Sequence, residues 1–400
     1  MITRNIYHSL LNHLPQKEYT ILVGARQTGK STLLKQLEET LRLAGESVIF
    51  LNLERKDILL ELNQSAENVF RYIAKNGIKK NYLLLDEVQY LDDPTHFLKL
   101  LFDEHHPHLK VIATGSSAFY IDKHFKDSLA GRKKIFELST LDFEEFLLFK
   151  NEDKLVKEIQ KLRSSKQQKS VHEQQLWLAL DEYLNYGGYP AVVLERKVSD
   201  KVERLMDLRD SFVKRDMLEA GISDETKFYK LLIMLAAQIG NLVNTNELAN
   251  TLRLTHPIVE NYLYVLQKCF HISLLRPFFG NLRKELVKMP KLYFNDFGLR
   301  NVLIHYFHPL EQRADKGLLL ENYVYRRLSD QFSRDQIKFW RTADGHEVDF
   351  VLESTNGDGK AIEVKFNPAE VYPKKYKKFT ETYTDYPLQF YSWKRPELLL

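Results

Sequence analysis

The sequence predicts a multidomain α/β protein whose first domain contains a parallel sheet with helices on both faces. Over the first 140 residues, short apolar runs alternate with longer amphipathic segments, which is the pattern of a parallel sheet built from strand–helix units. The 400 residues exceed what one hydrophobic core holds, and a hydrophobic content of 44% is enough to fill several cores. We therefore expect a chain that is folded throughout and divided into domains.

The first domain, residues 1–150, is expected to contain five strands. The apolar runs that predict them are Tyr19–Val23, Ser47–Leu51, Tyr82–Leu85, Lys110–Ala113 and Lys133–Leu138.

A helical linker and lid is predicted for residues 151–225. Lys, Glu, Gln and Ser predominate from 151 to 169, which indicates a solvated helix or linker rather than core. Helical periodicity follows over 174–220, broken by a turn at Gly187-Gly188-Tyr189-Pro190.

Residues 226–300 predict a winged helix-turn-helix, in which three helices are followed by a hairpin. Asn244 can cap the second helix, and Ile258–Phe270 is the expected third helix. The hairpin would pair His271–Pro277 with Lys291–Phe294.

Residues 301–400 predict a separate small α/β domain. Its first element is a helix, Leu318–Leu328, and strands are expected at Lys338–Arg341, Glu347–Leu352 and Lys360–Phe366.

Bulk properties exclude several classes of protein. Residues 1–14 predict a short amphipathic helix without the cleavage site of a signal peptide. The most apolar run, Leu231–Gly240, is half the length that a membrane span needs. The one cysteine, Cys269, lies in an apolar helical pattern and is expected to be a buried structural thiol. We expect a cytoplasmic protein with no membrane partner, and the net charge of +4 does not by itself indicate nucleic acid.

A glycine-rich loop follows the first strand and precedes a helical run. It matches G-x-x-x-x-G-K-[ST], and with the next residue it comprises Gly24, Ala25, Arg26, Gln27, Thr28, Gly29, Lys30, Ser31 and Thr32. Glycines let backbone N–H groups turn toward a phosphate, Lys30 can reach β- and γ-phosphate oxygens, and the Ser31 hydroxyl can ligate Mg²⁺. The loop therefore predicts ATP binding.

Two acids end the third apolar run. Asp86 is placed at the carboxyl edge of the sheet, where the magnesium of the loop would lie. Because side chains alternate along a strand, Glu87 points elsewhere and can act on an attacking water. This pair predicts hydrolysis of ATP.

Two other positions are candidates for contact with the γ-phosphate. Thr114 or Ser116, at the end of the fourth run, can sense the phosphate, and the alternative is a Ser-rich turn that caps a helix. Arg132 precedes the fifth run, where an arginine can project into the site of a neighbouring subunit in a homo-oligomer. The alternative is a surface arginine.

The chain resembles a known family at these residues. The loop, Leu83–Glu87, Thr114–Ser117 and Leu129–Arg132 with the following Leu138–Phe146 are similar to the AAA-superfamily P-loop ATPases of bacteria and archaea that carry a C-terminal uncharacterised domain. Gly187–Pro190 and Arg215-Asp216 resemble further motifs of that family, and the likeness covers essentially the whole chain. It implies an AAA-type fold and ATPase activity. Arg215 either approaches the nucleotide or forms a structural ion pair with Asp216 or Glu219.

The last hundred residues resemble a second pattern, that of the PD-(D/E)xK nucleases. Asp349 is followed by Glu363 and Lys365, and Glu321 on the preceding helix supplies a further acid. Glu363 and Lys365 share one face of a strand, so the acid can bind Mg²⁺ or Mn²⁺ while the lysine orients water. A restriction-endonuclease-like fold is expected, with either cleavage or a binding role.

Two functions are open at this stage. The first is a Mg²⁺-dependent ATPase whose nucleotide state moves the winged helix and the nuclease-like domain on DNA; the second is a regulatory switch ATPase that controls a protein partner, with an inactive nuclease-like domain. The predicted recognition helix is poor in Lys and Arg, whereas the hairpin is basic, which favours sequence-independent phosphate contacts. Its basic residues are Arg276, Arg283, Lys284 and Lys288.

Overall fold

The computed structural model describes residues 2–73, 80–115, 129–165, 170–279, 285, 288–353 and 359–399. Its backbone separates into two compact units. The first contains Met1–Thr140, Arg215–Gly221 and Lys268–Phe270, and the second contains the rest of the chain. The domain boundaries expected at residues 150, 225 and 300 remain predictions.

The first unit contains the predicted parallel sheet. Its strands are β1 (Tyr19–Val23), β2 (Ser47–Asn52), β3 (Asn81–Asp86), β4 (Leu109–Gly115) and β5 (Lys133–Glu137). All neighbours pair in parallel, in the order β2-β3-β4-β1-β5. β4 thus lies between the strand before the glycine-rich loop and the strand that ends in Asp86.

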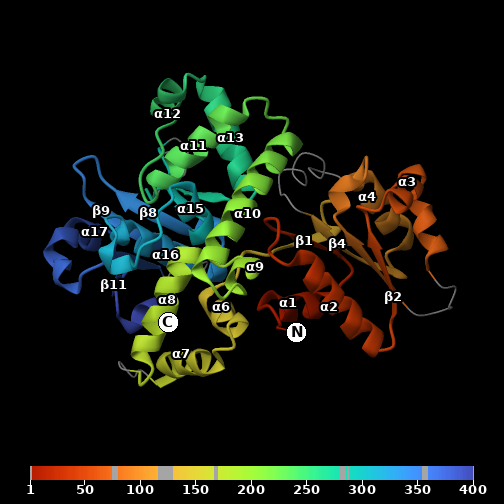
Figure 1. Ribbon diagram of the computed structural model, residues 1–400, viewed down its shortest axis with the longest axis horizontal. Helices are drawn as coiled ribbons and strands as arrows, with labels where there is room; N and C mark the ends of the chain where they lie inside the picture. Colours follow the sequence, from red (N-terminus) through yellow and green to blue (C-terminus); the bar gives the residue numbers. More distant parts are fainter. Residues whose placement is uncertain are drawn as a thin grey trace. The chain divides into compact units, whose positions relative to one another are not determined.

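Helices cover both faces of this sheet, as seen at the red and orange end of the chain in Figure 1. On one face, α1 (Ile6–His13) and α2 (Lys30–Leu43) bury leucines against Leu22, Leu84 and Ile112. On the other face, α3 (Lys56–Gln64) and α4 (Pro94–His105) pack on the alternate residues of the same strands. The alternation of a strand therefore sends successive apolar side chains into two cores.

The second unit begins with helices. They are α6 (Phe143–Phe149), α7 (Asp153–Ser165), α8 (Glu173–Tyr186), α9 (Pro190–Val193) and α10 (Val198–Glu219). The expectation that residues 151–169 lie outside the core is wrong for α7, which buries Leu155, Val156, Ile159 and Leu162. These four residues share one helix face, and the charged residues between them hide that face when composition is averaged. The last turn of α10, from Arg215, belongs to the first unit.

The three predicted helices and the two pairing strands of residues 226–300 are present. They are α11 (Glu225–Ala237), α12 (Thr245–Leu252), α13 (His256–Lys268), β6 (Ile272–Leu275) and β7 (Lys291–Phe294). The Asn244 side chain caps α12 by accepting from the Glu247 N–H at 3.3 Å, and β6 and β7 pair antiparallel. Their use as a DNA-binding winged helix stays a prediction, and Arg283 and Lys284 lie outside the described residues.

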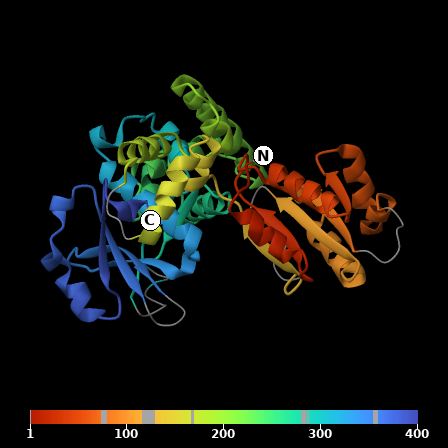
Figure 2. The same cartoon turned by 90° about the horizontal axis from the view of Figure 1, so that it is seen from below.

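The C-terminal part contains a four-stranded sheet, which is blue in Figure 2. After α15 (Phe297–Leu303), its elements are α16 (Lys316–Gln331), β8 (Ile337–Arg341), β9 (Glu347–Leu352), β10 (Lys360–Lys365), α17 (Lys377–Thr382) and β11 (Leu388–Ser392). The order is β11-β10-β9-β8, and α16 packs on β10. The expected helix and three strands are confirmed, and β11 is an addition. Among the described helices, none combines the length and apolarity that crossing a bilayer requires.

Candidate functional site

The glycine-rich loop has a backbone that only glycine permits at its first position. A Cβ on Gly24 would lie 2.1 Å from the carbonyl oxygen of Leu138, which follows β5. At the end of the loop, Gly29 has φ +96° and forms the N-cap of α2, a conformation that other residues rarely adopt. The loop therefore passes tightly over β5 and delivers Lys30 and Ser31 to the first turn of a helix, where N–H groups are free to bind an anion.

Lys30 is buried and turned onto its own loop. Its Nζ donates to the carbonyl oxygens of Gly24 at 3.0 Å and Ala25 at 2.9 Å. Burial lowers the pKa of Lys30 to about 8, although the carboxylate of Glu87 acts in the opposite direction. The ammonium therefore donates to neutral carbonyls and would gain strongly from a phosphate.

Asp86 accepts hydrogen bonds from hydroxyl groups on α2 and β4. Its Oδ1 accepts from Ser31 Oγ at 3.0 Å and from Thr114 Oγ1 at 2.6 Å. Asp86 is the last residue of β3 and is only 4% exposed. The structure thus brings together three residues that the sequence places far apart.

Ser31 and Asp86 fit a magnesium ion. Two adjacent ligands of an octahedral Mg²⁺ lie about 3.0 Å apart when each is about 2.1 Å from the metal, and Ser31 Oγ and Asp86 Oδ1 are 3.0 Å apart. Such ions keep few protein ligands and take the rest from waters and substrate phosphates. A hydroxyl with one carboxylate is therefore a suitable donor set for Mg-ATP.

Glu87 follows Asp86 in a strained conformation. Its φ of +61° lies in the left-handed region, which costs a residue with a side chain about 1–3 kcal/mol and is concentrated at functional sites. Its backbone N–H donates to Thr114 Oγ1 at 2.9 Å, and its carboxylate accepts from the Gln89 amide. The Thr114 hydroxyl therefore positions both acids, because it contacts the side chain of Asp86 and the backbone N–H of Glu87.

The other predicted contacts of the nucleotide differ in their position. Ser116 lies outside the described residues. Arg132 lies at the sheet edge opposite the loop, because its carbonyl accepts from the N–H of Tyr19 at the start of β1. Its guanidinium pairs with Asp103 at 2.6 Å. Arg132 therefore has a partner in its own unit, and its action on a neighbouring subunit stays a prediction.

Arg4 is a supporting residue that the sequence analysis does not single out. It precedes α1 and donates to the carbonyl oxygens of Thr28 and Ser139, at 2.8 Å each. It thereby ties the loop to the segment after β5. The only local signal is an arginine in an amphipathic N-terminal segment, which does not specify its distant acceptors.

ATP affinity should fall above about pH 8. Bound phosphates favour the charged form of Lys30, so its pKa is higher in the complex than the value of about 8 in the free protein. Binding then takes up a proton: affinity is complete below pH 8 and falls by up to about tenfold per pH unit above it. Calorimetry of Mg-ATP binding at pH 8.5 in two buffers of different ionisation enthalpy measures that proton. Lys30→Arg, which does not titrate, should bind without proton uptake; equal uptake in both proteins would contradict the assignment.

The acids predicted near the C-terminus come together in the second unit. Asp349 on β9 and Glu363 on β10 are directly linked, since the Asp349 N–H donates to Glu363 Oε2 at 3.3 Å and the Val364 N–H donates to Asp349 Oδ2 at 2.8 Å. Glu363 also pairs with Lys365 and accepts from Tyr376 Oη at 2.8 Å. Glu363 and Lys365 therefore share a face, as predicted.

Lys291 on β7 lies among these acids, and the sequence analysis does not single it out. Its Nζ is 2.9 Å from Glu321 Oε1 and 3.5 Å from Asp349 Oδ1, and it also pairs with Glu347. Lys291 is 2% exposed. We call this set the C-terminal charge cluster; it comprises Lys291, Glu321, Glu347, Asp349, Glu363 and Lys365.

The acids of the cluster are held partly in the neutral form. Burial, with the charge of Asp349, raises the pKa of Glu321 to about 7 against the opposing effect of Lys291. Burial, again with Asp349, raises the pKa of Glu363 to about 8 against Lys365. The cluster therefore has more carboxyl groups than its two lysines can balance.

The cluster does not fit a divalent metal ion as it stands. Within the described ranges, the one group of three His, Cys, Asp or Glu ligand atoms that all lie within 4.8 Å is Glu67, Glu104 and His105, on the surface of the first unit. Glu321, Asp349 and Glu363 do not reach that spacing, and the Lys291 ammonium is the cation that pairs with Glu321 and Asp349. Metal binding there stays a prediction that requires Lys291 to move.

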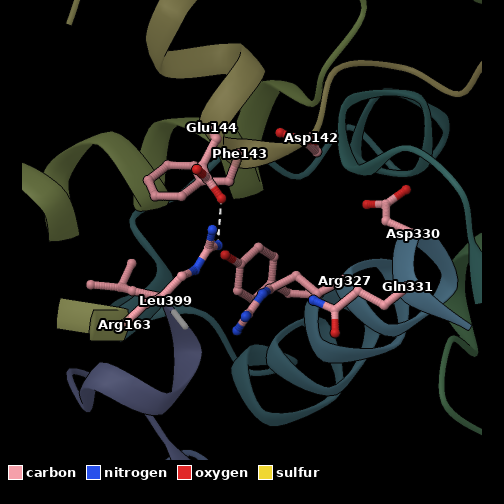
Figure 3. A pocket seen from close by; sticks show the side chains of 9 residues that line it. Asp142, Phe143, Glu144, Arg163, Arg327, Asp330, Gln331 and Leu399 are labelled. Carbon is pink, nitrogen blue, oxygen red and sulfur yellow. Dashed lines mark ion pairs between the residues drawn. The ribbon is translucent and has the colours of Figure 1, made fainter. Parts of the chain in front are cut away.

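A separate cavity of about 400 Å³ lies between α6, α7 and α16 in the second unit (Figure 3). The two arginines on its wall have partners: Arg163 pairs with Glu144, and Arg327 donates to the carbonyl oxygens of Glu397 at 2.9 Å and Leu398 at 2.7 Å. None of the residues predicted to bind or react lines it, and we assign it no ligand.

The parallel sheet, the glycine-rich loop and the oxygen cluster of Ser31, Asp86 and Thr114 are the features of a P-loop nucleotide-binding domain. Residues 16–147 match a family model described as AAA domain. Residues 178–309 and 316–394 match two models described as domains of unknown function, DUF8612 and DUF4143.

Similarity to other proteins extends along most of the chain. The chain is 26% identical over 343 residues to an uncharacterized protein of Methanocaldococcus jannaschii, and the alignment covers 84% of this chain and 72% of the relative. It is 26% identical over 372 residues to an uncharacterized protein of Haemophilus influenzae, with 89% and 85% covered. Among solved structures, the chain is similar to the ORC2 protein of Aeropyrum pernix in its ADPNP–ADP complexes. The superposition covers 67% of this chain and 85% of the ORC2 chain, with 13% sequence identity and a TM-score of 0.40.

Proposed function

We propose that this protein is a Mg²⁺-dependent ATPase that hydrolyses ATP to ADP and phosphate. The observation that carries the proposal is the meeting of Ser31, Asp86 and Thr114 at the end of the loop, with two oxygen–oxygen distances of 3.0 and 2.6 Å. An anion-binding helix start and a metal-binding oxygen pair at one sheet edge are what a nucleoside triphosphate requires.

Each residue has a distinct task in this proposal. The N–H groups of the loop and Lys30 bind the phosphates, and Lys30 leaves the carbonyls of Gly24 and Ala25 to do so. A magnesium ion held by Ser31 and Asp86 would neutralise charge on the phosphate oxygens. Glu87 accepts a proton from the attacking water, and Thr114 keeps the two acids in register.

We further propose that the nucleotide state acts on DNA through residues 226–400. The order of three helices and a hairpin, with the exposed Arg276 and Lys288 beside it, supports phosphate contacts. The alternative is a regulatory switch that controls a protein partner, and the buried Lys291 favours an inactive nuclease-like part in either case. In a homo-oligomer, Arg132 is the proposed contact from the neighbouring subunit.

The rate of ATP hydrolysis with and without DNA separates the two functions. If DNA is the substrate, short duplexes and single strands of unrelated sequence should raise kcat several-fold, and the stimulation should fall steeply between 50 and 200 mM salt, as roughly expected for a phosphate-dominated contact. Glu87→Gln is the control for contaminating ATPases. A rate that no DNA changes at low salt would favour the regulatory switch.

A further inference from the structure

Arg26, the third residue of the loop, is held by two carboxylates from a distant part of the sequence. Its Nε is 3.1 Å from Asp216 Oδ1, and its Nη2 pairs with Glu219 Oε1. Asp216 and Glu219 lie on the last turn of α10, which belongs to the same compact unit as the loop. We call these two acids the carboxylate pair.

The end of α10 also contacts the short helix that follows Asp86 and Glu87. Arg215 pairs with Glu219 at 3.7 Å, so the expected structural ion pair is present, and its guanidinium lies 5.8 Å from the ring centre of Tyr90. Tyr90 ends the short helix that begins directly after Glu87. The end of α10 therefore contacts both the phosphate loop and the segment of Glu87.

Burial makes these contacts sensitive to a change of charge. The side chains of Arg26 and Asp216 are 11% and 4% exposed, and a buried carboxylate that loses its partner is strongly unfavourable. The charge of Asp216 is also felt at Lys30, where the phosphates bind. A triphosphate at the loop is thus a new anion beside a buried carboxylate, and it offers Arg26 a more highly charged partner.

We propose that Asp216 and Glu219 set the affinity of the nucleotide site: they hold Arg26 while the loop is free, and a bound triphosphate takes Arg26 from them. This rests on the proposed function, since it requires that ATP bind the loop. The nucleotide site then extends beyond residues 16–147 to the end of α10. When Arg26 leaves, the last turn of α10 loses its main polar contact with the loop.

The test is Mg-ATP binding to the full chain by calorimetry. Asp216→Asn combined with Glu219→Gln should lower the Kd by about tenfold, because roughly one charge-assisted hydrogen bond no longer competes with the triphosphate for Arg26. The same double variant should lower the melting temperature of the free protein. Loss of a structural contact alone would weaken both binding and stability. Glu219→Gln by itself is the milder variant, with an intermediate decrease of Kd. Glu203→Gln, an exposed acid earlier on α10, is the matched control and should leave Kd unchanged.

Hydrogen exchange gives a second readout. In Glu87→Gln, which retains ATP, adding Mg-ATP should increase amide exchange in residues 215–221, and the increase should be absent when the carboxylate pair is also replaced. Unchanged or weaker ATP binding by both carboxylate variants, with normal binding by the wild type, overturns the role of the pair. Absence of ATP binding by the wild type would instead overturn the proposed function together with this inference.

Discussion

Glu87→Gln should bind Mg-ATP as tightly as the wild-type protein and lose turnover by a factor of about 10² to 10⁴, the usual contribution of a general base. The amide keeps the size of the side chain and can still contact Gln89, but it cannot take a proton from water. Thr114 contacts the backbone of residue 87 and the side chain of Asp86, so the metal-binding oxygens stay in place. Single-turnover hydrolysis and equilibrium binding of ATP separate the two effects.

Lys30→Ala is the contrasting variant and should lose binding as well as turnover. In the free protein, the Lys30 ammonium donates to loop carbonyls, so its removal mainly affects the complex. If Glu87→Gln hydrolyses ATP at the wild-type rate, another residue activates the water. If both variants lose binding equally, the distinction between the two roles is wrong.

The nucleotide site was predictable because its information is local. The loop, Asp86 and Thr114 each stand at the end of an apolar run, and parallel strands bring such ends to one edge of the sheet. A pattern of apolar runs therefore specifies both the elements and the meeting of their ends. The alternation that separates the two cores follows from the same runs.

The pairing of charges across long separations was not predictable in the same way. Arg26 and Asp216 are 190 residues apart, and Lys291 and Glu321 are 30 apart on different elements. Each is an ordinary charged residue in its own segment, and only the packing of whole elements decides which of many opposite charges it meets. The sequence contains one weak signal for the ion pair of Lys291, which lies directly before the apolar run Leu292–Phe294 of a strand. A lysine is rarely buried unless it is paired, so a lysine at this position indicates an acidic partner.

Lys291→Met should destabilise the second unit by about 3–5 kcal/mol, the usual cost of removing one partner from a buried ion pair. Methionine fills much of the same volume, but Glu321, Asp349 and Glu347 lose their shared cation. All three tryptophans, Trp177, Trp340 and Trp393, belong to the second unit, so their fluorescence during urea unfolding of the full chain reports this unit. Lys288→Met, an exposed lysine on the same segment, is the matched control and should change stability little.

The pH dependence of this loss identifies its cause. The pKa of Glu321 is raised to about 7 and that of Glu363 to about 8 in the folded protein, so the folded state binds more protons than the unfolded state and its stability falls as pH rises from about 5 to 8. Without Lys291 the pKa of Glu321 rises further, because the charge of Lys291 lowers it in the wild-type protein, and the destabilisation should be larger at pH 8 than at pH 5. Lys291→Met with Glu321→Gln should recover part of the stability at pH 8, because one uncompensated charge is gone.

The same variants decide between an internal cation and a metal. If the Lys291 ammonium takes the place of a divalent ion, Mn²⁺ should not raise the unfolding midpoint of the wild-type second unit, whereas Lys291→Met should gain Mn²⁺ binding that Asp349→Ala removes. The midpoint by tryptophan fluorescence with and without Mn²⁺ measures this directly. A wild-type protein that Mn²⁺ stabilises, with the effect lost in Asp349→Ala, would show that the acids bind metal despite Lys291. That result would favour the nuclease-like interpretation of Glu321, Asp349, Glu363 and Lys365. The metal ion would then supply the positive charge that balances these acids.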